Sequence, residues 1–237
     1  MKINEVIKLS NLRMLQFVAI KLQDLCHDVV FLGGCTTGIF ITDLASPDVR
    51  HTLDVDCIVD VISLNQYHTL EKKLQKQGFK KSMQDDVVCR WHYDDVILDV
   101  MPTDEKILGF GNRWYKAAIQ YAQNYQLTKE IAIKVVTAPF FLATKLEAFR
   151  GRGKMDFYAS HDMEDILSVI DGRLEIVEEV MVTNGDLKKY LAKSFSEMMQ
   201  NRFFHDALPG HLVHYGNLSE ERIDLLLEKV NQIVTHF

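Results

Sequence analysis

The chain has 237 residues, a formal net charge of −6 and 47% hydrophobic residues, which allow one large domain or a catalytic core with a helical lobe. No apolar run approaches the roughly 20 residues of a membrane helix, and the polar residues 1–10 do not resemble a signal peptide. Four scattered cysteines without a C-x-x-C pair argue against zinc, and the acidic balance argues against a nucleic-acid coat. We therefore expect a cytoplasmic protein without a membrane partner.

The N-terminal segment predicts a helix, a strand and a glycine turn. Ser10 is a helix-capping residue, and apolar residues at helical spacing follow it. Val29–Leu32 predicts a strand, and Gly33-Gly34 ends it before a helix predicted over 35–44. A strand that leads through glycines into a helix lets backbone N–H groups approach a phosphate. Gly33 and Gly34 therefore form a candidate phosphate-binding turn.

A run of alternating apolar and acidic residues follows at Leu53–Val61. Strict alternation predicts a strand with one apolar face. Asp54 and Asp56 then project from the opposite face, two residues apart. Two close carboxylates repel each other unless a cation lies between them, and a divalent metal with oxygen ligands is the usual solution. The pair is a candidate metal site.

The middle of the chain predicts a helix, a hairpin and a buried acid. The predicted elements are a helix over 64–77 ended by Gly78, a short strand over 79–82, hairpin strands over 87–93 and 96–101 about Asp94-Asp95, a helix over 112–122 and a last strand over 131–136. Asp99 lies in the second hairpin strand among apolar residues, and a buried carboxylate needs a partner. That partner is either a basic side chain or a metal at the candidate site.

The C-terminal part begins with a helix over 138–149 that carries Lys145 within its apolar face. The cationic residues Arg150, Arg152 and Lys154 alternate with glycines after it, which indicates either a solvated loop or a clamp on a triphosphate or an RNA backbone. Ser160 can cap the next helix, and Asp162 and Asp165 lie in its first turns. Further helices are predicted over 174–181, 187–199 and 220–234, and no metal is assigned to His205, His211 and His214.

Two stretches resemble a known superfamily. Gly33-Gly34 followed by Arg50-x-Thr52-x-Asp54-x-Asp56 resembles the signature of polymerase-beta-like nucleotidyltransferases, nearest to the AbiEii-type toxins of abortive-infection, type IV toxin–antitoxin systems. The resemblance covers about residues 29–171. It implies that the glycine turn, Thr36, Arg50 and Thr52 bind the nucleotide. It also implies that Asp54, Asp56 and Asp99 hold magnesium or manganese.

The second stretch is Ala143-Thr144-Lys145-Leu146-Glu147-Ala148, which resembles the Ala-x-Lys-x-x-Ala helix of these toxins. The resemblance implies that Lys145 contacts nucleotide phosphates. The segment 160–165 resembles the D-x-x-D segment that follows, so Asp162 or Asp165 would orient Lys145 or accept a proton. Cys35 stands where many relatives have serine, and the hydroxyl contact to phosphate would fall to Thr36 or Thr37.

We therefore expect an α+β (α/β) protein with a nucleotidyltransferase-type mixed, curved sheet of about five strands. Residues 1–137 would form the catalytic core and 138–237 a helical lobe. The expected function is magnesium-dependent transfer of a nucleotide from a nucleoside triphosphate to an acceptor hydroxyl.

By resemblance the acceptor is RNA, such as the 3′ end of a transfer RNA, held by Arg150, Arg152 and Lys154, or a protein hydroxyl. An antitoxin protein is the expected partner. The alternatives are an inactive nucleotide- or protein-binding module and an antibiotic-modifying nucleotidyltransferase, for which an acidic acceptor pocket would be evidence.

Overall fold

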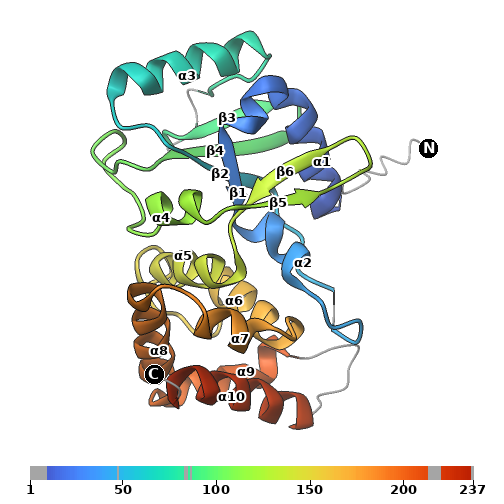
Figure 1. Cartoon of the computed structure of the whole chain (residues 1–237), viewed down its shortest axis with the longest axis vertical. Coiled ribbons are helices and arrows are strands. Elements are labelled where there is room, and N and C mark those ends of the chain that lie inside the picture. The colour runs from blue at the N-terminus through green and yellow to red at the C-terminus, as the bar shows by residue number, and fades with distance from the viewer. Residues whose placement is uncertain (1–9, 47, 83–84, 86, 213–219, 236–237) are drawn as a thin grey trace, which may run out of the picture.

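A computed structural model describes residues 10–46, 48–82, 85, 87–212 and 220–235, in which a six-stranded mixed sheet lies beside a group of helices (Figure 1). The strand order is β3-β4-β2-β1-β6-β5. β2 is antiparallel to β1 and parallel to β4. The predicted mixed sheet is confirmed, with six described strands instead of about five. The strands are β1 Val29–Leu32, β2 Asp54–Val59, β3 Arg90–Tyr93, β4 Val96–Pro102, β5 Gln123–Gln126 and β6 Ala132–Val135.

The helices of the first half pack around this sheet. Ser10 caps the first of them, because its hydroxyl accepts a hydrogen bond from the Arg13 N–H at 3.4 Å. Gly78 follows the third with φ of +98°, a left-handed conformation that favours glycine. Both predictions are confirmed. The helices are α1 Asn11–Leu22, α2 Thr37–Phe40, α3 Leu64–Lys76 and α4 Tyr115–Gln120, with short 3₁₀ turns at Gln23–His27 and Gly34–Thr36.

From Ala138 onward the described elements are all helical, and in Figure 1 they lie together as the yellow to red group below the sheet. Phenylalanine side chains from three of these helices are among the most buried of the described residues: Phe141, Phe149, Phe195 and Phe204. The helices are α5 Ala138–Arg150, α6 His161–Gly172, α7 Ile176–Met181, α8 Gly185–Met199, α9 Arg202–His211 and α10 Glu220–Thr235. The division into two domains at residue 138 stays a prediction. None of the described helices has the length and apolar character that crossing a bilayer requires.

Several predicted elements differ in the structure. No described strand covers 79–82, where Lys80 forms only an isolated bridge with His92. The polar edge strand β5 was not predicted, because pairing with β6 holds it rather than burial of alternate side chains. Helix α9 was not predicted because Pro209-Gly210 indicates a turn. Pro209 instead lies near the helix end, where burial of residues such as Phe204 outweighs one lost hydrogen bond.

The segment between α2 and β2 is bound along helix α6. The N–H groups of Thr42 and Asp43 both donate to the Gly172 carbonyl at 2.9 Å, so the helix predicted over 35–44 ends early, at Phe40. Arg50 at the other end of this segment forms an ion pair with Asp165. Both ends of α6 are therefore attached to the chain that leads into the acidic strand.

Candidate active site

Three carboxylates meet on β2 and β4. The alternation of β2 leaves Asp54 and Asp56 half-buried on one face, between buried apolar residues. In the parallel pairing of β2 with β4, Asp56 lies opposite Asp99. Gly33 comes so close that a Cβ atom there would lie 2.0 Å from Oδ2 of Asp56, and its φ is +78°. Only glycine fits this position, and the glycine turn therefore touches the acidic centre.

Asp56 is the carboxylate of this centre without an ion pair to a described residue. It forms no hydrogen bond or ion pair with another described residue. Burial, followed by the neighbouring charge of Asp54, raises the pKa of Asp56 to about 7. Asp54 accepts a 2.7 Å hydrogen bond from the Thr52 hydroxyl. Cys35 nearby is a buried thiol whose pKa is raised by burial and by Asp56, so it behaves as a packing residue rather than a thiolate.

Asp99 is bound by a residue that the sequence analysis did not select, Arg90. The Arg90 guanidinium donates from Nε and Nη2 to the two carboxylate oxygens of Asp99 at 2.9 and 2.7 Å, and Nη2 lies 3.4 Å from Oδ2 of Asp54. Of the two partners predicted for Asp99, the structure therefore contains the basic side chain. The hairpin places Arg90 opposite Asp99 in the β3–β4 register.

A second ionic cluster lies on α5 and α6, and we call it the ion network. Lys145, which is 4% exposed, contacts Asp162 at 2.9 Å and Asp165 at 2.6 Å. Arg152 makes two hydrogen bonds to Asp162, at 3.1 and 3.0 Å, and Arg50 makes two to Asp165, at 2.9 and 2.8 Å. Burial would lower the pKa of Lys145, but the two aspartates outweigh it and hold it above its ordinary value. Both acids thus orient the lysine.

The glycine turn joins the two clusters. A Cβ atom at Gly34 would lie 2.5 Å from Nη2 of Arg50 and 3.3 Å from Oδ2 of Asp165. The Thr36 hydroxyl donates to the Gly33 carbonyl at 2.8 Å and so stabilises the turn itself. The Thr37 hydroxyl is buried without a hydrogen-bond partner among the described residues. Thr37 is therefore the threonine whose hydroxyl is not used inside the turn.

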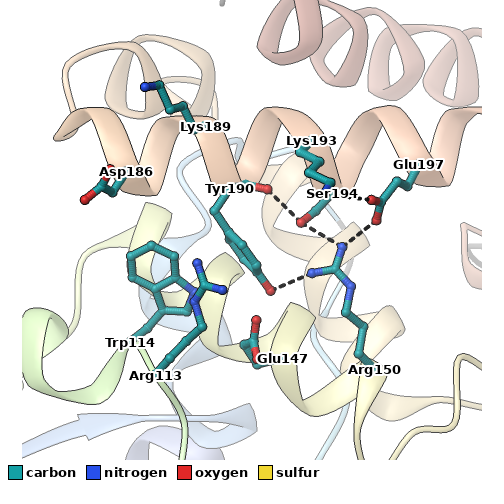
Figure 2. Close-up of a pocket in the computed structure, with 10 residues that line it drawn as sticks. All are labelled: Arg113, Trp114, Glu147, Arg150, Asp186, Lys189, Tyr190, Lys193, Ser194 and Glu197. Atoms are coloured by element: carbon teal, nitrogen blue, oxygen red, sulfur yellow. Dashed lines mark hydrogen bonds and ion pairs between the residues drawn. The ribbon is translucent and has the colours of Figure 1, made fainter.

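The three cations predicted to bind the acceptor lie in different places. Arg150 belongs to helix α5 rather than to a loop, and Figure 2 shows it bonded to Tyr190, Ser194 and Glu197 of α8. Arg152 is part of the ion network, and Lys154 is exposed. The prediction of one loop that carries all three cations is therefore wrong, because the helix includes the first of them.

Arg150 lines an open pocket of about 700 Å³ between α5, α8 and the start of α4 (Figure 2). The Arg113 guanidinium lies 4.8 Å from the ring centres of Trp114 and Tyr190, within cation–π range. Arg113 and Lys189 form no ion pair with another described residue. The lining residues are Arg113, Trp114, Glu147, Arg150, Asp186, Lys189, Tyr190, Lys193, Ser194 and Glu197.

The donor groups fit one divalent cation better than a three-carboxylate centre. Within the described part of the chain, no group of three or more His, Cys, Asp or Glu side chains is arranged to hold a metal ion. Asp54 and Asp56 lie two residues apart on one face of β2, and Asp56 has no ion pair or hydrogen bond with a described residue. Asp99 has both oxygens bonded to Arg90. The pair Asp54 and Asp56 is thus the part of the acidic centre that suits a hard cation.

No family model and no curated protein matches the chain, whereas eleven solved chains match it. One of them is an antigenic nucleotidyltransferase-like protein from Paracoccidioides brasiliensis, 19% identical, with a TM-score of 0.51 over 96% of this chain and 97% of that one. The fold is nucleotidyltransferase-like. A protein from H. pylori that is assigned as a nucleotidyltransferase matches with 11% identity and a TM-score of 0.47, over 95% of each chain. The predicted fold class is confirmed, and the nearer resemblance to AbiEii-type toxins stays a prediction.

Proposed function

We propose that the protein transfers a nucleotide from a nucleoside triphosphate to an acceptor hydroxyl, with magnesium or manganese as cofactor. The observation that carries this proposal is the carboxylate pair beside the glycine turn. Asp56 is partly buried next to Asp54 without an ion pair to a described residue, and burial and the charge of Asp54 disfavour its ionised form and raise its pKa to about 7. Asp54 and Asp56 would hold the cation, which supplies positive charge to the triphosphate when bound.

The ion network supplies the remaining positive charge. It contains the cations Lys145, Arg50 and Arg152 against only two carboxylates, and it reaches the glycine turn through Arg50. Its excess charge suits the phosphates of the nucleotide, whose developing negative charge fixed cations stabilise during transfer. Asp162 has a lowered pKa despite its burial, because Arg152 and Lys145 bind it. It is a weak proton acceptor, and we assign it to holding Lys145.

The acceptor that the surface favours is RNA. The pocket of Figure 2 offers Arg113 and Lys189, neither of which is in an ion pair within the described chain, beside the rings of Trp114 and Tyr190. Trp114 is buried and Tyr190 half-buried, so the two cations are the groups of this pocket that suit the phosphates of a strand. Lys145 and Arg150 lie on the same helix about 7.5 Å apart along its axis. Membership of a toxin–antitoxin pair is part of the same proposal.

The test is incubation of the full chain with magnesium, each labelled nucleoside triphosphate in turn, and total cellular RNA. We expect label on RNA, and parallel reactions with a protein mixture and with cationic antibiotics test the other acceptors. The protein should also melt at a higher temperature with magnesium and triphosphate, because a ligand bound by the folded state stabilises it. A rise in melting temperature with no labelled product in any reaction would favour the nucleotide-binding module without catalysis.

A further inference from the structure

Arg90 lies in the acidic centre at the point where a second cation would otherwise be held. The β3–β4 pairing places it directly across from Asp99, and its side chain is 22% exposed while that of Asp99 is 9% exposed. Both carboxylate oxygens of Asp99 accept hydrogen bonds from it, in the two-pronged geometry that makes arginine–carboxylate pairs strong. The same guanidinium reaches Asp54 at 3.4 Å.

This geometry conflicts with a divalent cation on Asp99. Metal binding there would have to displace two charge-assisted hydrogen bonds and bring the metal against a guanidinium that stays charged at any physiological pH. The oxygens of Asp56 carry no such contact from any described residue. The two sides of the acidic centre therefore differ: the side facing Asp56 needs a cation, and the side facing Asp99 already contains one.

We propose that Arg90 replaces a second metal ion. It holds Asp99 and contacts Oδ2 of Asp54. The site then binds one divalent cation, held by Asp54 and Asp56, and the guanidinium carries the other positive charge of the centre. This inference rests on the proposed function, since it concerns how that same site is charged. Arg90 is then a positioning residue, which acts through the two carboxylates that it binds.

The number of bound cations tests this directly. Full-length protein with a non-hydrolysable triphosphate analogue is titrated with Mn²⁺, free Mn²⁺ is measured by electron paramagnetic resonance, and a titration of the analogue without protein is subtracted. We expect one Mn²⁺ per chain in the wild type and two in both Arg90→Ala and Arg90→Gln. Arg90→Lys keeps a positive charge and should still bind one.

Arg152→Ala is the matched control. It also removes one positive charge near Asp56, since Arg152 interacts electrostatically with that carboxylate, but it leaves Asp99 bound to Arg90. We expect one Mn²⁺ in this variant at saturating analogue, and the readout is the number of bound ions, not their affinity, because Arg152 also belongs to the ion network. A second Mn²⁺ in Arg152→Ala would show that general charge, and not the place of Arg90, sets the number.

Two Mn²⁺ in the wild type, or one in both Arg90→Ala and Arg90→Gln, would overturn the inference and leave the proposed function standing. No bound Mn²⁺ in the wild type would contradict both. Circular dichroism checks the fold of each variant, and if Arg90→Ala does not fold, the wild-type count and Arg90→Gln still decide.

Discussion

The acidic centre on the sheet and the ion network on the helices use the same residue types with opposite charge balance. In the acidic centre Arg90 contacts two of the three carboxylates, Asp54 and Asp99, and Asp56 has no ion pair within the described chain. In the ion network each of two carboxylates binds two cations. A region with excess negative charge favours binding of a cation from solution, whereas a network of paired charges is stable as it is. The comparison indicates that the acidic centre needs a bound cation, whereas the ion network keeps its arrangement without a ligand.

Removing the central cation of the ion network should have the largest effect on stability. Lys145→Ala leaves Asp162 and Asp165 with one cation each in a buried setting, and we expect a loss of about 3 kcal/mol in the free energy of unfolding. Urea unfolding followed by circular dichroism measures it. Lys72→Ala, on an exposed position of α3, should change the value by no more than about 0.5 kcal/mol. Equal midpoints for both variants would mean that the network is not held together by its lysine.

Neutralising the acidic centre should reduce activity without loss of stability. We expect Asp56→Asn to lower nucleotide transfer about 100-fold or more, because it removes a ligand of the proposed cation. Its free energy of unfolding without metal should stay the same or rise, since the repulsion from Asp54 is relieved. Asp60→Asn, just beyond the end of β2, is the control and should retain near wild-type turnover. Substantial turnover in Asp56→Asn would remove this residue from the site.

The pH dependence of stability should report the same carboxylate. Folding raises the pKa of Asp56 from 3.8 to about 7, so between these values the folded state binds a proton that the unfolded state has lost. The free energy of unfolding of the metal-free protein should therefore fall as pH rises from about 4 to about 7, by about 3 kcal/mol from this residue. The difference between wild type and Asp56→Asn in urea unfolding isolates this contribution. Saturating magnesium should abolish it, and a pH dependence identical in the two proteins would contradict the raised pKa.

The smallest effect concerns the pocket beside the ion network. Each RNA phosphate contact made by Arg or Lys adds about 0.7 log units to the salt dependence of binding to a single strand. The double variant Arg113→Ala and Lys189→Ala removes two such cations and should therefore flatten the slope of log affinity against log salt by about 1.4 units. Lys72→Ala again serves as the control. Equal slopes for the double variant and the wild type would instead favour a protein hydroxyl or a small molecule as the acceptor.

The sequence predicted the acidic strand, the glycine turn and the caps, because alternation, glycine and capping residues act over a few residues. The hairpin that it predicts also implies that Arg90 lies opposite Asp99. In a hairpin with its turn at Asp94-Asp95, Tyr93 pairs with Val96, and the same count places Arg90 across from Asp99. The predicted hairpin therefore implied this pairing, although Arg90 was not selected as the partner of Asp99.

Other features depended on contacts that a local pattern does not contain. Arg50 and Asp165 are 115 residues apart in the chain, and their pairing exists only because α6 packs beside the segment before β2. Arg150 and Arg152 were grouped in the sequence analysis because one glycine separates them. In the structure Arg150, at the end of α5, bonds to α8, whereas Arg152 bonds to Asp162. The role of each arginine thus follows from the tertiary partner and not from the glycines around it.

The attachment of α6 at both ends restricts how the molecule can open. Its first turns are held by Arg50, and its last residue, Gly172, accepts both N–H groups of Thr42 and Asp43. A hinge motion that separates the sheet from the helices has to break these contacts together, along the full length of the helix. As long as these contacts hold, the lysine and the carboxylate pair keep a fixed separation, and substrate enters through movement of side chains and loops at the rim.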